Sequence, residues 1–100
     1  MRVVIFHRSR LFASCLAQVL NDPPSDEAFA LDAADSGLLS RTEQIGPDLV
    51  VVDLDLATVP CTDLVMAIGE RIAGARFLAL ASSETHPDIA ACVRAGVSGL

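Results

Sequence analysis

The chain has few aromatic residues and few positive charges. Its 100 residues include four Phe and neither Trp nor Tyr, so the 52% of apolar residues that must form a core are mainly Ala, Val, Leu and Ile. Thirteen acidic residues outnumber seven Lys and Arg, and the formal net charge is −6. Because surfaces that bind nucleic-acid phosphates are basic, we do not expect this segment to bind nucleic acid directly. That expectation leaves open a DNA-binding domain beyond Leu100.

Cysteines are few, and long apolar runs are missing. Cys15, Cys61 and Cys92 are odd in number, widely spaced and without a CxxC pair, which favours reduced thiols over a disulfide framework or a zinc site. All three fall in or at the start of an expected helix, where we expect small apolar core residues. No apolar run approaches the ~18 residues of a membrane helix, and no secretory leader pattern opens the chain. We expect a cytoplasmic protein that does not enter a membrane.

Sequence motifs of enzymes are also missing. No GxGxxG, P-loop, GxSxG or zinc-ligand spacing occurs along the chain. These patterns mark dinucleotide, nucleotide, nucleophile and metal sites. A generic flavodoxin-like enzyme therefore has no motif support, and we expect a protein that is not an enzyme.

The chain does have a buried strand that ends in a carboxylate. An unbroken apolar run over residues 49–52, three of them Val, leads directly into Asp53. Such a run is typical of a central strand covered on both faces in a parallel sheet. Ligands and chemistry in open α/β sheets gather at the carboxyl ends of the strands. Asp53 is therefore the leading candidate for a functional residue.

Strand and helix patterns alternate along the whole chain. Strands are predicted at 2–6, 28–33, 49–53, 76–81 and 97–100, and helices at about 10–20, 36–45, 62–73 and 86–95. This alternation predicts an α/β fold with right-handed parallel crossovers and a doubly wound sheet. Ser9 is the predicted N-cap of the first helix, and Gly46 the predicted C-terminal cap of the second. The first helix carries its apolar residues on one wide stripe: Leu11, Phe12, Cys15, Leu16, Val19 and Leu20.

A closing helix after the last strand is missing from the pattern. We therefore expect a single domain over residues 1–100 that is truncated before its final helix. One face of the sheet would then be exposed.

Three fragments, in the correct order and spacing, resemble bacterial response-regulator receiver domains of the kind that precede a LuxR/NarL-type helix-turn-helix. PDLVVVDLDL (47–56) resembles the phosphoacceptor strand of that family. LFASCLAQVL (11–20) resembles its first helix, and VRAGVSGL (93–100) resembles its approach to the fifth strand. The resemblance implies a flavodoxin-like, CheY-like fold with five parallel strands in the order 2-1-3-4-5.

The resemblance also implies a site around Asp53. Asp53 would be the phosphoacceptor, and a magnesium ion would be held by an acidic pair after the first strand, by Asp53 and by the backbone carbonyl of Asp55. A hydroxyl residue would end the fourth strand, at Ala81 or, after a shift of one residue, at Ser82. A Lys would end the fifth strand, beyond Leu100.

The sequence departs from this pattern at the positions that would bind the metal. His7 and Arg8 stand where the acidic pair belongs. A hard divalent ion needs oxygen ligands, and a guanidinium is never a ligand, so we expect no magnesium cofactor. Two alternatives stay open for Arg8: its charge takes the place of the metal and pairs with Asp53, or its side chain points to solvent. For His7, we expect an ordinary hydrogen bond and no chemical role.

We therefore expect an atypical receiver domain of a two-component-type transcriptional regulator, which acts through protein–protein contact without normal magnesium-dependent phosphorylation. The resemblance implies a homodimer formed by the helix at 86–95 and the strand at 97–100, with a possible C-terminal DNA-binding domain or another regulator as a further partner. Two alternatives remain. One is a functional phosphoacceptor that uses Asp53, and the other is a sensor of a small ligand or anion in the crevice lined by His7, Arg8, Asp53 and Ser82.

Overall fold

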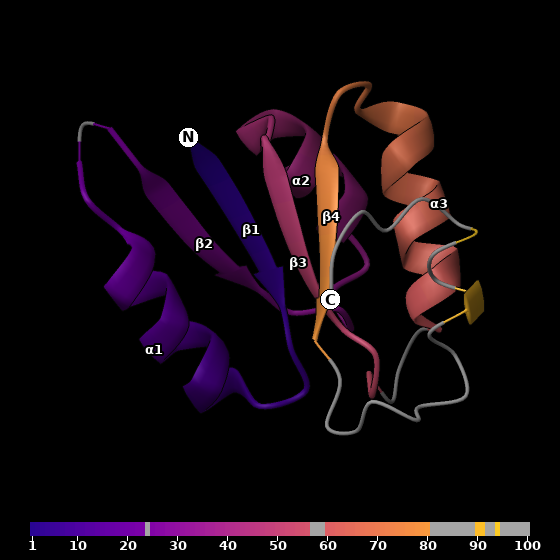
Figure 1. Ribbon diagram of the computed structural model, residues 1–100, viewed down its shortest axis with the longest axis horizontal. Helices are drawn as coiled ribbons and strands as arrows, with labels where there is room; N and C mark the ends of the chain where they lie inside the picture. Colours follow the sequence, from indigo (N-terminus) through magenta and orange to yellow (C-terminus); the bar gives the residue numbers. More distant parts are fainter. Residues whose placement is uncertain (24, 57–59, 81–89, 92–93, 95–100) are drawn as a thin grey trace.

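A parallel sheet organises the chain. The computed structural model describes residues 1–23, 25–56, 60–80, 90–91 and 94. Within these residues the elements are β1 (Arg2–Phe6), α1 (Arg10–Leu20), β2 (Glu27–Leu31), α2 (Leu38–Ile45), β3 (Leu49–Asp53), α3 (Cys61–Arg71) and β4 (Arg76–Leu80). Every strand pair is parallel, and the strand order is β2-β1-β3-β4 (Figure 1).

This order confirms the first four strands of the predicted topology. The predicted fifth strand at 97–100 lies outside the described residues, as does most of the predicted helix at 86–95. A five-stranded sheet therefore stays a prediction. The predicted second strand at 28–33 is shifted, since β2 is Glu27–Leu31, and α2 begins at Leu38 instead of residue 36.

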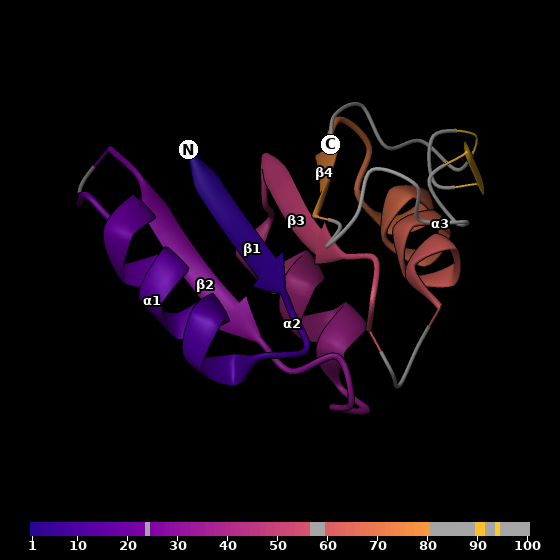
Figure 2. The same ribbon diagram turned by 60° about the horizontal axis from the view of Figure 1, so that its bottom comes forward.

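Helices cover both faces of the sheet, as Figures 1 and 2 show, with α1 on one face and α2 and α3 on the other. The alternation of side chains along β1 and β3 produces two cores. Toward α2 and α3, Phe6 and Val52 pack with Leu64, Val65 and Ile68. On the opposite face, the core is made by Val3, Ile5, Val51 and Ala13 of α1. The central Val run of β3 is buried throughout, as an enclosed strand requires.

Local signals at the ends of helices behave as the sequence predicts. The Ser9 hydroxyl oxygen accepts the backbone N–H of Phe12 at 3.2 Å and caps α1. Gly46 follows α2 with a φ of 65°, a left-handed conformation that an L side chain rarely adopts. The Ser9 cap fixes the start of α1, directly after the loop that joins β1 to α1.

Only part of the apolar stripe of α1 packs against the sheet. Ala13 is buried and Leu16 is partly buried, whereas Leu11, Phe12 and Val19 are exposed by 76%, 46% and 80%. Cys15 is also exposed, so the prediction that it is a core residue is wrong. The physical reason is that α1 lies over β1 and β2 and contacts them through a narrow face. The Cys61 side chain and Cys92 lie outside the described residues, and their predicted core roles stay predictions.

None of the helices in the described part of the chain combines the length and the apolar character that crossing a bilayer requires.

Candidate functional site

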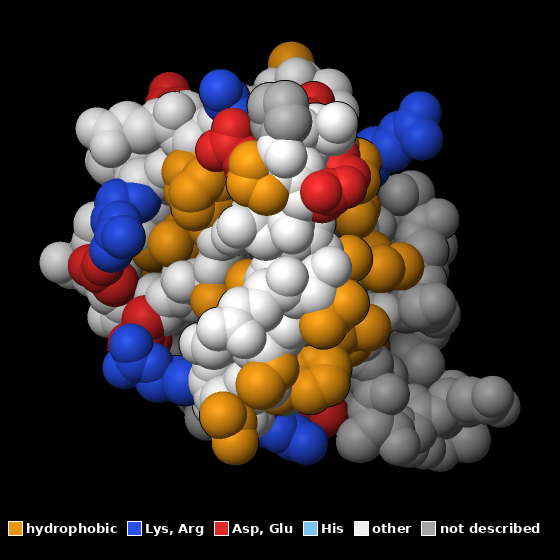
Figure 3. Space-filling view, turned by 90° about the vertical axis from the view of Figure 1, so that its left-hand side faces the viewer, with side chains coloured by type: hydrophobic (Ala, Val, Ile, Leu, Met, Phe, Trp, Pro, Cys, Tyr) orange, Lys and Arg blue, Asp and Glu red, His pale blue; other side chains and the backbone are white. Residues whose placement is uncertain are grey.

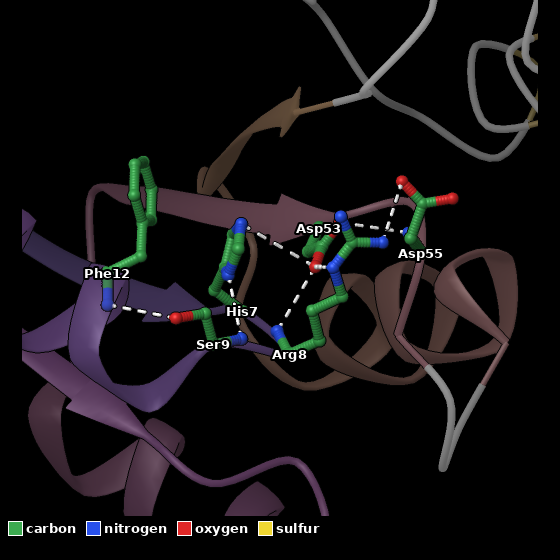
Figure 4. Close-up of polar contacts among 6 residues, drawn as sticks. All are labelled: His7, Arg8, Ser9, Phe12, Asp53 and Asp55. Atoms are coloured by element: carbon green, nitrogen blue, oxygen red, sulfur yellow. Dashed lines mark hydrogen bonds and ion pairs between the residues drawn. The ribbon is translucent and has the colours of Figure 1, made fainter.

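The carboxyl ends of β1 and β3 bring the predicted site residues together. Phe6 is paired with Val52 in the parallel register, so the residues that follow β1 lie beside Asp53 at the end of β3. Figure 4 shows the His7 ring and the Arg8 side chain directed toward the Asp53 carboxylate, and the Asp55 carboxylate directed toward the Arg8 guanidinium. The site therefore joins the β1–α1 loop to the β3–α3 loop.

Asp53 is a buried carboxylate whose two oxygens both accept backbone hydrogen bonds. Its side chain is only 3% exposed. Oδ1 accepts the N–H of Asp55 at 2.9 Å, and Oδ2 accepts the N–H of Arg8 at 3.1 Å. A buried charge needs such partners, and hydrogen bonds to an ionised acceptor are the strong ones. The backbone of the two loops thus holds the carboxylate before any side chain contributes.

Arg8 spans the two acidic side chains of the site. Its Nε lies 3.9 Å from Oδ2 of Asp53, and its Nη1 lies 3.4 Å from Oδ2 of Asp55. The Arg8 side chain is also 53% exposed, so it pairs with the carboxylates and still reaches solvent. Pairing with Asp53 and exposure to solvent, which the sequence left open as alternatives, thus occur together, and the replacement of a metal by Arg8 stays a prediction. Exposed ion pairs contribute little free energy, so we expect this contact to contribute little to stability.

His7 is oriented by its own neighbours. Its Nδ1 accepts the backbone N–H of Ser9 at 2.9 Å, which places the proton of the neutral ring on Nε2. That Nε2 faces Oδ2 of Asp53 at 3.6 Å, too long for a hydrogen bond. The ring also lies against Phe12, with centroids 4.5 Å apart. His7 is thus held with its Nε2 directed toward Asp53.

The charged groups of these residues mainly contact one another. Two carboxylates face one guanidinium and an imidazole N–H, and the Asp53 oxygens are already engaged by backbone amides. No three or more His, Cys, Asp or Glu side chains are grouped to hold a metal ion in the parts of the chain that the structure describes. The arrangement is suited to holding two loops in one conformation.

The predicted site and the observed site differ in the residues that they include. Ala81 and Ser82, the predicted hydroxyl positions, lie outside the described residues. The sequence assigned only the backbone carbonyl of Asp55, yet its carboxylate contacts Arg8. The sequence also gave no role to Ser9 and Phe12 in orienting His7. The His–x–Ser spacing at the start of a helix was the available signal.

The similarity of this chain to known proteins lies in its fold. No protein-family model matches the sequence, and no curated protein matches it significantly. Among solved structures, the signal receiver domain of a DNA-binding response regulator (merR) from Colwellia psychrerythraea 34H matches with a TM-score of 0.78 and 22% identity, covering 99% of this chain and 85% of that one.

Two further neighbours have the same fold. A LuxR-family two-component response regulator from Aurantimonas sp. SI85-9A1 matches with a TM-score of 0.78 and 22% identity over 98% of this chain and 70% of that one. A response regulator from Burkholderia pseudomallei, solved with a phosphorylated aspartic acid, a calcium ion and citrate, matches with a TM-score of 0.79 and 18% identity over 98% of this chain and 56% of that one. The structural neighbours are therefore response-regulator receiver domains, and this chain has their CheY-like fold.

Proposed function

We propose that this chain is an atypical receiver domain in which Arg8, instead of a metal ion, links the β1–α1 loop to the β3–α3 loop. In this proposal the domain signals by protein–protein contact and is neither an enzyme nor a magnesium-dependent phosphoacceptor. The observation that supports it most is the position of the guanidinium, 3.9 Å from Oδ2 of Asp53 and 3.4 Å from Oδ2 of Asp55.

The chemistry of the site does not fit a magnesium ion. Magnesium demands near-octahedral oxygen coordination, and an arginine side chain has only N–H donors. A cation already lies against both carboxylates, so a second cation would be repelled from the same space. In phosphoryl transfer, a bound divalent cation stabilises the negative charge that develops in the transition state, and without it this stabilisation is lost. The proposal therefore includes no metal cofactor.

The burial of Asp53 supports the same conclusion. A nucleophilic oxygen needs access to the incoming phosphorus atom. Here Oδ1 and Oδ2 each accept a backbone N–H, and the residue is almost fully buried. Asp53 is then an anchor that fixes the conformation of the two loops.

The proposed partners are proteins. By analogy with the LuxR-family neighbour, the chain would be the N-terminal part of a cytoplasmic transcriptional regulator, with a DNA-binding domain or another regulator as its output. A homodimer through residues 86–100 is part of this proposal, and its face falls mostly on residues outside those described. Direct nucleic-acid binding by this segment is not proposed, since its net charge is −6.

An acetyl phosphate assay with magnesium tests the proposal. The chain is incubated with both reagents, and intact mass spectrometry follows the gain of one phosphoryl group, with Asp53→Asn as the matched control. We expect the mass of both proteins to stay unchanged. Stoichiometric phosphorylation that Asp53→Asn abolishes would replace the proposal with its first alternative, a working phosphoacceptor. The phosphorylated aspartic acid of the Burkholderia pseudomallei neighbour is the observation that favours that alternative.

The second alternative, an anion sensor, is favoured by the half-exposed Arg8 guanidinium at the strand ends. A bound anion would have to displace Asp55 from Nη1. Inorganic phosphate that raises the melting temperature of the wild-type chain, but not that of Arg8→Ala, would support a sensor. Equal behaviour of the two proteins would exclude it.

A further inference from the structure

A cavity of about 400 Å³ lies between α2 and α3, the two helices on the face of the sheet opposite α1 (Figure 2). Its apolar walls come from these helices and from the loop between β2 and α2: Ala33, Ala34, Leu38, Leu39, Leu64 and Ala67. Leu38 and Leu39 pack only in part against the core, so apolar surface remains open on them. Both walls belong to the described part of the chain, and their apolar character suits a hydrophobic ligand.

The charged residues that line the cavity are all negative. Asp35 and Asp63 both line it, and no Arg is among the described residues that do so. Asp35 is engaged elsewhere, since its Oδ2 lies 3.2 Å from Nη1 of Arg41. Figure 3 shows Arg side chains beside acidic side chains on one side of the molecule, and Arg10 with Asp32 is another ion pair of this chain. Asp63 differs, because it is exposed in the first turn of α3 and forms no ion pair within the described residues.

The size and the charge of the cavity favour a small cationic molecule. Ligand cavities of roughly 300–1,000 Å³ are mostly apolar, with a few polar groups that fix the orientation of the ligand. A protein partner needs a contact of roughly 1,200–2,000 Å², and the exposed side chains of α2 are polar or charged: Ser40, Arg41, Glu43 and Gln44. A second copy of the chain would bring its own net charge of −6 toward the same carboxylates.

We propose that the cavity between α2 and α3 binds a small apolar amine, whose ammonium group pairs with Asp63 and whose hydrocarbon body lies against Leu39 and Ala67. An ion pair at an exposed carboxylate changes an affinity by at most about fivefold. Most of the affinity then comes from the apolar surface that the ligand buries, and Asp63 selects the charge of the ligand.

This site is separate from the site around Asp53. Neither Arg8 nor Asp53 is among the residues that line the cavity. Failure of the amine to bind would leave the proposed function in place, and phosphorylation of Asp53 would leave the amine site in place.

Three probes with the same hydrocarbon body separate recognition of charge from apolar binding: phenylbutylamine, phenylbutanol and phenylbutyrate. Each is titrated into the full chain, and the backbone amide resonances of Leu39 and Ala67 are followed. Phenylbutylamine should shift both resonances saturably and bind most tightly, and phenylbutyrate should bind most weakly because its carboxylate is repelled by Asp63. Equal affinities of the three probes, or no saturable shift, would overturn the proposal. Shifts that grow with protein concentration in the absence of any probe would show that a second copy covers the cavity, and they would overturn it too.

Asp63→Asn gives the matched comparison. It should weaken the binding of phenylbutylamine by about three- to fivefold and leave that of phenylbutanol within about twofold. Glu70→Gln removes an exposed acid of the same helix that does not line the cavity, and it should leave both affinities within about twofold. If the two variants weaken the amine equally, Asp63 does not recognise it and the proposal is wrong.

Ala67→Leu tests the apolar wall of the cavity. The larger side chain occupies part of the space between the two helices, so neither phenylbutylamine nor phenylbutanol should bind. Circular dichroism checks that this variant folds. Unchanged binding of the amine to folded Ala67→Leu would place the ligand outside the cavity and overturn the proposal.

Discussion

The backbone N–H of Arg8 donates to Oδ2 of Asp53 at 3.1 Å, so the loop after β1 is attached to the end of β3 through the main chain. This bond does not depend on which side chain occupies position 8. Substitutions of Arg8 therefore remove the guanidinium and leave the carboxylate anchored. The role of the charge can be measured separately from the role of the loop.

Arg8→Ala tests whether the guanidinium controls geometry more than stability. Because the side chain is 53% exposed, we expect the free energy of unfolding in urea to change by less than about 1 kcal/mol. Amide hydrogen exchange of Asp55 should become faster, since the contact from Nη1 to Asp55 is lost. Arg10→Ala, which removes another exposed ion pair, is the control and should leave the Asp55 amide unchanged. A loss of several kcal/mol in Arg8→Ala would show that the contact is structural.

Asp53→Asn should destabilise the chain far more than Asp55→Asn. The new amide NH₂ would replace one of the two carboxylate oxygens. In the place of Oδ2 it would face the N–H donors of Arg8 and His7, and in the place of Oδ1 it would face the N–H of Asp55. A buried donor left without an acceptor costs about 1–3 kcal/mol. The Asp55 side chain is 21% exposed, and water can replace the contact that it loses. Urea denaturation of both variants measures the difference, and equal losses would show that Asp53 is not the anchor.

The contribution of the Asp35 carboxylate to the stability of the fold should depend on pH. The N–H of Gly37 donates to Oδ1 of Asp35 at 2.9 Å, and this bond, together with Arg41, holds the pKa of Asp35 below its ordinary value of 3.8. A lowered pKa in the folded state stabilises the chain above the unfolded pKa, and this contribution is lost as pH falls through the folded pKa.

Asp35→Asn should therefore unfold at a lower urea concentration than the wild type at neutral pH. The difference between the two denaturation midpoints should disappear as pH falls below about 4. In this range the wild-type carboxyl becomes protonated first in the unfolded state and then in the folded state. Denaturation midpoints at several pH values measure the trend. If the difference between the midpoints instead grows in acid, the folded state does not stabilise the Asp35 carboxylate.

Sequence patterns predicted the sheet and the location of the site because both depend on local signals. The apolar run of β3 and the alternation of strands and helices place Asp53 and residues 7 and 8 at the carboxyl edge of a parallel sheet, and the resemblance to receiver domains placed β1 beside β3. The contacts of Arg8 were not predictable in the same way, because a long exposed side chain has many rotamers that the sequence does not restrict. Its position depends on where the β3–α3 loop places the Asp55 carboxylate.

The α1 helix shows a second limit of sequence patterns. Its apolar periodicity correctly predicted a helix over residues 10–20, but periodicity does not say which neighbour covers each apolar residue. Cys15 appeared to be a core residue because it lies on the stripe, yet the sheet reaches only the side of Ala13 and Leu16. The tertiary neighbours of a helix decide which of its apolar residues are buried.

Under the proposed function, Arg8→Asp should create a site for a divalent metal ion. This change removes the cation and adds a third carboxylate beside Asp53 and Asp55, which is the donor type that divalent ions prefer. We expect calorimetry to detect saturable magnesium binding. Arg8→Asn is the control, because it removes the positive charge without adding a carboxylate. If the two variants bind magnesium equally, the added carboxylate at position 8 does not create the site.

The most direct test of the account is a magnesium titration of the unmodified chain, followed by the backbone amide resonances of Arg8 and Asp55. Both amides donate to the Asp53 carboxylate, so they report any ion that binds there. If Arg8 takes the place of the metal, neither resonance shifts in a saturable way as magnesium is added. Saturable shifts at both amides would show that a divalent ion binds beside Asp53 despite Arg8, and they would contradict the account.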